Sequence, residues 1–494
     1  MSLYDDLTEL NGTGRYPMHM PGHKRRLPPF PGAPVEYDFT EIEGSDDLHR
    51  PQSILADAMR RTADLTGADR TFYLVNGSTG GNLAAVTAMA PGGGELIVAR
   101  NCHQSVFHAL EINRIRAHWV WPSYEPSAGI WGSVRPEDVE KLLVRWPAVR
   151  GVVVTSPTYE GVLSDIAGLA SVCHRRGVPL CVDEAHGAHL GLVRDSGFPD
   201  GAVRCGADLT VQSAHKTLIG LTQAAYLHLN GSLVDPDAVQ RGLDLFETSS
   251  PSYLLMLSLD GCTERIVKDG DRLFGAWRER LRRFREGTAD LTSLHLFTRD
   301  DALRSGACFD FDESKLLLHS LDSRVSGKAL METLRSRFRF ELEMAEGANA
   351  LAMTGPGDSG DALDRFADAL RTLDREYGDR RRGEKADGQE TIPYSGDGSE
   401  PTLSISEALL LPAETIPVRE AEGRVAAESV IGYPPGIPML LPGERVTEGQ
   451  IRALSGPLRC GGFRFSRSGP DLAVISVLRR WHCRRDRTED RHDT

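Results

Sequence analysis

Lys216 and its neighbours form the stretch of the sequence best suited to chemistry. Residues 208–218 read Asp-Leu-Thr-Val-Gln-Ser-Ala-His-Lys-Thr-Leu, and 209–211 are predicted to form a short buried strand that delivers Ser213, His215 and Lys216 into one loop. A lysine amine forms Schiff bases with carbonyl compounds, and hydroxyl and imidazole groups beside it suit a phosphate ester. Because most lysines are solvated surface charges, this hypothesis needs support from elsewhere in the chain.

A carboxylate after a second predicted strand gives that support. Residues 178–182 are apolar and lead directly into Asp183. Buried parallel strands have this pattern, and ligands bind at their carboxyl ends. An acid one strand away from Lys216 could keep the pyridine nitrogen of pyridoxal phosphate (PLP) protonated, so that the ring accepts the electron pair released when a bond at the substrate Cα breaks.

A glycine-rich turn supplies a third group of candidate ligands. Residues 71–82 begin as a predicted strand and continue through Asn-Gly-Ser-Thr-Gly-Gly into a predicted helix. Ser78 and Thr79 bring hydroxyl groups, Gly80 permits close approach of backbone N–H groups, and the start of a helix favours negative charge. This combination is typical of a phosphate site.

These three stretches belong to a longer series of short polar and glycine- or proline-containing motifs along the chain. They lie at 20–24, 38–41, 44–48, 76–82, 101–105, 156–161, 183–187, 213–216, 248–253 and 433–438. In this order they resemble the Orn/Lys/Arg decarboxylases, PLP-dependent enzymes of the aspartate-aminotransferase fold (fold type I). The resemblance runs from residue 18 to about residue 444.

The resemblance implies how other residues contact PLP. His103 would stack on one face of the ring and Ala185 would lie under the other. Thr158 would line the side of the phenolic oxygen, although a simple turn around Pro157 explains it equally well. His186 is a candidate for the imine side of the ring, with helix capping or loop hydrogen bonding as the alternative.

Two pairs of residues are candidates for the phosphate. Ser213 and His215 would contact it within one chain, unless they serve only loop hydrogen bonding. In relatives, hydroxyls of the segment 248–253 reach the phosphate of the other subunit, so Ser249 and Ser250 are expected to act across a dimer. Capping of the following helix is the alternative for this pair.

Three residues are candidates for the substrate side. The first 50 residues have little periodicity and read as an irregular arm. By resemblance this arm crosses a dimer, which makes His23 and Asp46 candidate substrate contacts. Glu444 is a candidate partner for a cationic substrate end, with an exposed surface carboxylate as the alternative.

The order of predicted elements defines the fold class. Strands and helices alternate regularly from residue 71, which favours an α/β fold with a mostly parallel central sheet and helices on both faces. The expected divisions are an arm at 1–50, a large PLP-binding domain at 51–265, a smaller α+β domain at 266–375, a linker at 376–399, a C-terminal domain at 400–456 and a tail at 457–494.

Composition narrows the class of protein further. The 494 residues include no run of about 18 apolar residues, and a formal net charge of −13 argues against a nucleic-acid surface. The eight cysteines contain no Cys-x-x-Cys and are expected to be reduced thiols of a cytoplasmic protein. His186 and His189 are three apart without a third ligand, so no metal site is expected.

Decarboxylation of arginine, lysine or ornithine to the corresponding amine is therefore the expected function. Lys216 would hold PLP, Asp183 would act on the ring nitrogen, and Lys216 or His215 would return a proton to Cα. An aminotransferase, another PLP reaction or a non-catalytic regulator remain alternatives, because one fold hosts many reactions. A homodimer or dimer-based tetramer is expected.

Overall fold

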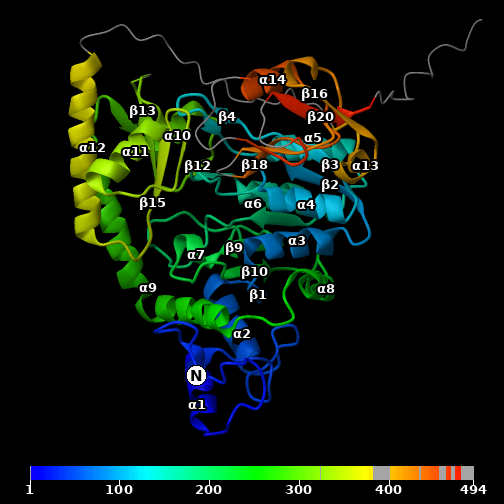
Figure 1. Ribbon diagram of the computed structural model, residues 1–494, viewed down its shortest axis with the longest axis vertical. Helices are drawn as coiled ribbons and strands as arrows, with labels where there is room; N and C mark the ends of the chain where they lie inside the picture. Colours follow the sequence, from blue (N-terminus) through cyan, green and yellow to red (C-terminus); the bar gives the residue numbers. More distant parts are fainter. Residues whose placement is uncertain are drawn as a thin grey trace, which may run out of the picture.

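A seven-stranded sheet forms the centre of the protein. The computed structural model describes residues 2–322, 324–381, 401–432, 436–455, 463–468 and 473–479 (Figure 1). The strand order is β1–β10–β9–β8–β6–β2–β3. The strands are β1 (Arg70–Leu74), β10 (Ala225–Leu229), β9 (Leu209–Ser213), β8 (Leu180–Asp183), β6 (Val152–Thr155), β2 (Gly94–Ala99) and β3 (Ile115–Val120).

The predicted mostly parallel sheet is confirmed. Strands β3, β2, β6, β8 and β9 pair in parallel, while β10 pairs antiparallel with both of its neighbours. Every residue of β8, β9 and β10 is buried. Burial on both faces favours apolar residues, which explains the apolar run of β8 that ends in Asp183.

Helices cover both faces of this sheet, as predicted. Alternate residues of a strand point to opposite faces. Leu74 packs into the core cluster that contains α3 (Gly77–Met89) and α8 (Pro236–Phe246). Its neighbour Tyr73 packs instead with α2 (Ile54–Thr66) and α9 (Tyr253–Gly287). The remaining helices of this layer structure are α4 (Gln104–Ile112), α5 (Pro136–Arg145) and α6 (Ile166–His174).

A smaller antiparallel sheet lies beside the large one (upper left in Figure 1). Its order is β11 (Leu294–Leu296), β13 (Lys315–Ser320), β15 (Asn349–Met353) and β14 (Met344–Glu346), and it is flanked by α10 (Arg299–Ser305), α11 (Gly327–Phe338) and α12 (Gly360–Arg381). The expected boundary at 265/266 falls inside the continuous helix α9. The expected linker at 376–399 begins too early, because α12 continues to Arg381 and buries Tyr377.

Two further small sheets belong to the C-terminal part. One pairs β16 (Ala413–Pro417) with β20 (Val474–Leu478), and the other joins β18 (Ile437–Leu440), β17 (Val430–Gly432) and β19 (Phe463–Phe465). Helices α13 (Ile405–Leu409) and α14 (Glu448–Ser455) accompany them. Part of the expected tail at 457–494 therefore completes these sheets. The rest of that tail and the linker residues 382–399 lie outside the described residues.

The N-terminal arm is not irregular throughout, contrary to the expectation. Helix α1 (Leu3–Gly12) begins with a capping box between Ser2 and Asp5. Leu3 and Leu7 lie on one face of this helix and are fully buried. Helix α2 starts at Ile54, and the Asp46 carboxylate accepts hydrogen bonds from three N–H groups just before and inside its first turn.

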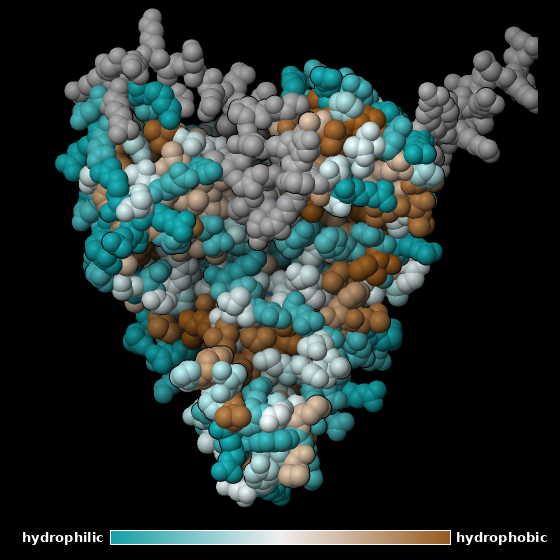
Figure 2. All heavy atoms as spheres, viewed as in Figure 1, coloured by the Kyte–Doolittle hydropathy of each residue, from teal (hydrophilic) through white to brown (hydrophobic). Residues whose placement is uncertain are grey.

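Most of the visible surface is hydrophilic, with apolar residues gathered around its middle (Figure 2). Leu245 of α8 and Val267 of α9 are among the exposed large side chains. Within the described part of the chain, no helix has both the length and the apolar character needed to cross a membrane.

Candidate active site

A cavity of about 440 Å³ opens where the large sheet meets the smaller domain. Ten of the residues singled out from the sequence line it: Ser78, Thr79, His103, Thr158, Asp183, Ala185, His186, Ser213, His215 and Lys216. They come from different loops that follow β1, β2, β6, β8 and β9. Parallel strands bring these loops to the same edge of the sheet, which is why residues distant in sequence converge.

Lys216 lies in α7 (Ala214–Thr217), the single turn that follows β9. Its Nζ is 3.0 Å from Nε2 of His186. Burial lowers the pKa of the Lys216 amine, while the negative charges of Asp183 and Glu343 oppose this shift. A lysine in this setting gives up its proton more easily than one in water, which makes it a better nucleophile.

His186 is kept neutral by its surroundings. Burial lowers the pKa of its imidazole well below the usual value, and the nearby amines of Lys216 and Lys315 lower it further. A neutral imidazole has one N–H donor and one acceptor nitrogen. One ring nitrogen of His186 therefore donates a hydrogen bond and the other accepts one.

Asp183 is held rigidly at the end of β8. Its carboxylate is 3% exposed, and it accepts hydrogen bonds from Nδ2 of Asn82 at 2.8 Å and from the backbone N–H of Ala185 at 3.2 Å. Asn82 also donates to Oγ of Ser105, which lies 2.9 Å from Nδ1 of His103. These contacts fix the positions of an acid and an imidazole that line one cavity.

The expected phosphate site combines a helix start with two serines. Helix α3 begins at Gly77, whose φ of +70° suits glycine. Oγ of Ser78 and Oγ of Ser213 are 2.5 Å apart and hydrogen-bond to each other. Nδ1 of His215 donates to the carbonyl of Ala224, so its Nε2 remains available for a ligand. Burial lowers the pKa of the His215 ring.

The other predicted site residues lie outside this cavity. Gly80 is buried one turn further along α3, where an added Cβ would lie 2.6 Å from Oε1 of Glu247. His23 contacts Asp38, and Asp46 holds the start of α2. Ser249 and Ser250 are exposed, which leaves their predicted action across a dimer untested.

Glu444 is neither exposed nor free. It is 7% exposed, and both of its oxygens accept hydrogen bonds from the guanidinium of Arg100, at 2.8 and 2.9 Å. The alternative of a surface carboxylate is therefore wrong. Its carboxylate is already neutralised, and this counts against a direct contact with a cationic substrate.

Several cavity residues escaped the sequence interpretation. They are Asn82, Asn101, Trp131, Glu160, Gln223, Glu343 and Ile437. Asn82 lay inside the quoted glycine-rich motif, so its position six residues after Asn76 was a usable signal. Glu343 and Ile437 carried none, because they come from the smaller domain and the C-terminal part. Within the described ranges, no three metal-ligating side chains gather closely enough to hold an ion.

Comparisons with known proteins agree with this arrangement. The family described as "Orn/Lys/Arg decarboxylase, major domain" matches residues 2–323, and its C-terminal domain matches residues 400–455. The chain is 30% identical to an arginine decarboxylase of Bacillus subtilis over 93% of this chain and 94% of that one. It is also 30% identical to an arginine decarboxylase of Halalkalibacterium halodurans, covering 93% of both.

Solved structures support the fold. The lysine decarboxylase LdcF of Francisella novicida superposes with a TM-score of 0.79 at 17% identity, covering 97% of this chain and 81% of that one. Lysine decarboxylase A of Pseudomonas aeruginosa gives a TM-score of 0.78 at 20% identity, covering 97% and 80%. The predicted fold type is thereby confirmed.

Proposed function

The chain belongs to the Orn/Lys/Arg decarboxylase family, a family of carboxy-lyases, and from this premise we propose that it decarboxylates a basic amino acid with the help of PLP. One observation carries the proposal. A buried lysine whose pKa is lowered by its surroundings, a fixed buried carboxylate and the N-terminus of a 13-residue helix all face the same cavity of about 440 Å³. No simpler ligand needs all three groups.

The residues around the cavity fit PLP. Lys216 would hold its aldehyde carbon, and Asp183 would accept a hydrogen bond from its ring nitrogen. Ser78, Thr79 and Ser213 would bind the phosphate together with the backbone N–H groups at the start of α3. The cavity volume falls in the range of ordinary cofactor and ligand sites.

The chain's own residues orient the reaction and move its protons. When bound, PLP supplies an electron sink for the pair released at the substrate Cα. Asn82 and the N–H of Ala185 hold the Asp183 carboxylate in place, so it would offer the ring nitrogen an acceptor in a fixed position. Lys216, whose amine has a lowered pKa, would return a proton to Cα, with His215 as the alternative donor.

Acidic side chains in the cavity support a cationic substrate. With Asp183 assigned to the cofactor, Glu160 and Glu343 remain. Burial raises the pKa of the Glu160 carboxyl, whereas Glu343 is exposed at the cavity and accepts a hydrogen bond from the hydroxyl of Tyr159. We assign to Glu343 the contact with the distal cation of the substrate, because an ionised carboxylate binds guanidinium or ammonium groups strongly.

Arginine is the first substrate to test, because the two relatives that are 30% identical over 93% of this chain are named arginine decarboxylases. The constitutive lysine decarboxylase of Escherichia coli is 27% identical over only 51% of this chain. Cytoplasmic location, a role in polyamine biosynthesis and assembly as a homodimer or dimer-based tetramer stay predictions.

One experiment tests the function directly. The protein, reconstituted with PLP, is incubated separately with arginine, lysine and ornithine, and the products are identified by mass spectrometry. Release of CO2 with the matching amine is the expected result. Formation of a keto acid would replace decarboxylation by transamination or deamination, and absence of turnover with all three would refute the proposal.

A further inference from the structure

A second lysine lies behind His186, on the side away from Lys216. Nζ of Lys315 is 3.5 Å from Nδ1 of His186, at the long limit of a hydrogen bond, while Nζ of Lys216 is 3.0 Å from Nε2 of the same ring. The imidazole thus stands between two amines, one on each ring nitrogen. Unlike Lys216, Lys315 does not line the cavity.

The fold makes specific room for this second lysine. Lys315 is the first residue of β13, it is 1% exposed, and it ranks among the largest fully buried side chains. An added Cβ at Gly161 would lie 2.8 Å from Cγ of Lys315, and φ of Gly161 is +114°, which disfavours other residues. Next to it, β12 (Asp310–Phe311) pairs with β7 (Val162–Leu163) and joins the smaller domain to the large one.

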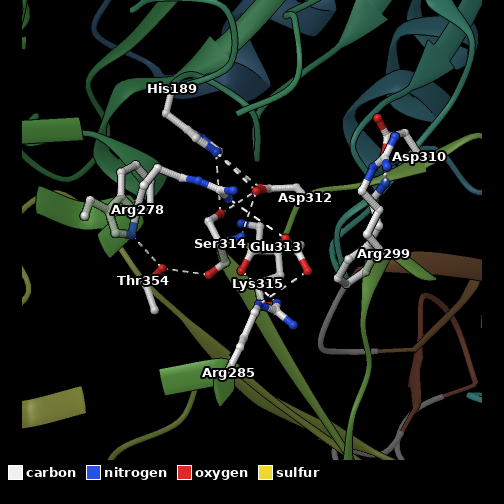
Figure 3. A network of polar contacts seen from close by, with 12 residues as sticks. His189, Arg278, Arg285, Arg299, Asp310, Asp312, Glu313, Ser314, Lys315 and Thr354 are labelled. Atoms are coloured by element: carbon white, nitrogen blue, oxygen red, sulfur yellow. Dashed lines mark hydrogen bonds and ion pairs between the residues drawn. The ribbon is translucent and has the colours of Figure 1, made fainter. Parts of the chain in front are cut away.

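A polar network surrounds the backbone of Lys315 (Figure 3). Asp312 accepts hydrogen bonds from the N–H and the hydroxyl of Ser314, and Arg285 donates to the carbonyl of Lys315 at 3.3 Å. These contacts hold the strand start in place. The network binds the backbone of Lys315, whereas its amine makes its hydrogen bond to His186.

Burial and nearby charges act on both Lys315 and His186. Burial lowers the pKa of Lys315 to about 8, Asp312, Glu343 and Glu160 oppose this shift, and Lys216 adds to it. His186 is affected by burial and by four groups, namely Lys216, Lys315, His103 and His215. At neutral pH an amine with this pKa carries its proton and can only donate.

We propose that Lys315 is a positioning residue that keeps the hydrogen of the His186 ring on Nε2, so that Lys216 faces a hydrogen-bond donor and holds its amine uncharged. The ammonium of Lys315 has no lone pair, so Nδ1 of His186 must be the accepting nitrogen. The remaining hydrogen then sits on Nε2 and points at Nζ of Lys216. An amine that accepts a hydrogen bond keeps its lone pair only while it is unprotonated.

This inference rests on the proposed role of Lys216, and its test separates the two. Full-length protein, treated with hydroxylamine to free Lys216 of any bound aldehyde, is labelled with acetic anhydride between pH 6 and 11. Peptide mass spectrometry gives the labelling of Lys216 at each pH, with the exposed Lys268 as internal standard. The apparent pKa of Lys216 is measurable whether or not the protein uses PLP.

Lys315→Met keeps the volume of the side chain and removes its charge. Without the ammonium, His186 can turn its acceptor nitrogen towards Lys216 and stabilise the protonated amine. We expect the apparent pKa of Lys216 to rise by about one unit, which lowers its labelling at pH 7 about tenfold. Lys315→Arg retains a permanent donor and should restore most of the labelling. If Lys315→Met does not fold, Lys315→Gln provides the same measurement.

A matched control comes from the same network. Ser314→Ala removes a hydroxyl that contacts Asp312 and leaves the charge of Lys315 intact, so Lys216 labelling should not change. An unchanged Lys216 pKa in Lys315→Met, with altered melting temperature only, would mean that Lys315 has a purely structural role. If Lys315→Met shifts the pKa of Lys216 equally in a His186→Phe background, Lys315 does not act on Lys216 through the His186 ring, and the proposal is overturned.

Discussion

His186 and His189 are three residues apart, and both are buried, yet they belong to contrasting regions. His186, 6% exposed, stands between two lysine amines at the cavity wall. His189, 0% exposed, lies in the network of Figure 3, where its Nε2 is 3.3 Å from Oδ2 of Asp312.

The difference shows that neighbouring charges decide what a buried imidazole does. Around His186 the cations add to burial, and the ring stays neutral. Burial alone would raise the pKa of Asp312, but His189 and the N–H of Ser314 lower it to about 2, so this carboxylate is ionised. One region is therefore suited to moving protons, and the other to holding the two domains together.

The largest effect is expected from removing the cavity lysine. Lys216→Ala should abolish both the visible absorbance of the PLP adduct and the release of CO2, a loss of more than ~1000-fold. The control is Lys268→Ala, which removes an exposed amine. Undiminished turnover in Lys216→Ala would show that another group holds the cofactor.

Asp183→Asn tests the fixed carboxylate of the cavity. The amide retains the shape of the side chain but cannot stabilise a protonated ring nitrogen, so kcat should fall ~100-fold or more. Absorbance after reconstitution should still reach the wild-type level, because Lys216 and the phosphate site are intact. Normal kcat would mean that a different group protonates the ring.

Lys315→Met should change stability in a pH-dependent way. The folded-state pKa of Lys315 is lowered from 10.5 to about 8, so the protonated amine is unfavourable in the folded protein below pH 8. The variant should therefore be more stable at pH 7, by at most about 3 kcal/mol, and this gain should fade as the pH rises from 8 to 10.5. Urea unfolding at pH 7 and pH 10.5 measures the difference in unfolding free energy between the variant and the wild type. A loss of stability at pH 7 would show that the buried ammonium of Lys315 does not destabilise the folded protein.

Asp312→Asn should weaken the His189 region instead. Loss of the charged acceptor leaves His189 and Ser314 with weaker hydrogen bonds, and we expect a loss of about 2 kcal/mol at pH 7. Because the pKa of Asp312 drops from 3.8 to about 2 on folding, its contribution is present above pH 4 and disappears as the pH falls to 2. Acid unfolding curves of both proteins should therefore converge near pH 2.

Glu343→Gln is expected to have the smallest effect. It removes an exposed negative charge from the cavity and leaves the hydrogen bond to Tyr159 possible. We expect KM for the basic amino acid to rise about tenfold with little change in kcat. A fall in kcat with unchanged KM would assign Glu343 to the chemistry rather than to the binding of the distal cation.

Short-range patterns were enough to identify the framework and most of the cavity. The apolar run before Asp183 and the glycines after β1 mark strand ends directly, since burial on both faces favours apolar residues and small residues let backbone N–H groups approach a ligand. The same reasoning missed α1, where the Leu3 and Leu7 pair is too short to stand out from a polar segment.

Contacts between distant segments were decided only by the tertiary structure. Lys315 is 99 positions beyond Lys216 in the sequence, and nothing in its own surroundings distinguishes it from an exposed lysine until β12 pairs with β7 and buries it. For the same reason, the sequence could not show that Glu444 is buried. Its burial depends on Arg100, which directly follows β2 and donates a hydrogen bond to the Glu444 carboxylate. The periodicity of a sequence shows which face of its own strand or helix a residue occupies. Whether that residue is buried, and which charged groups lie beside it, depends on the other segments that pack against this face.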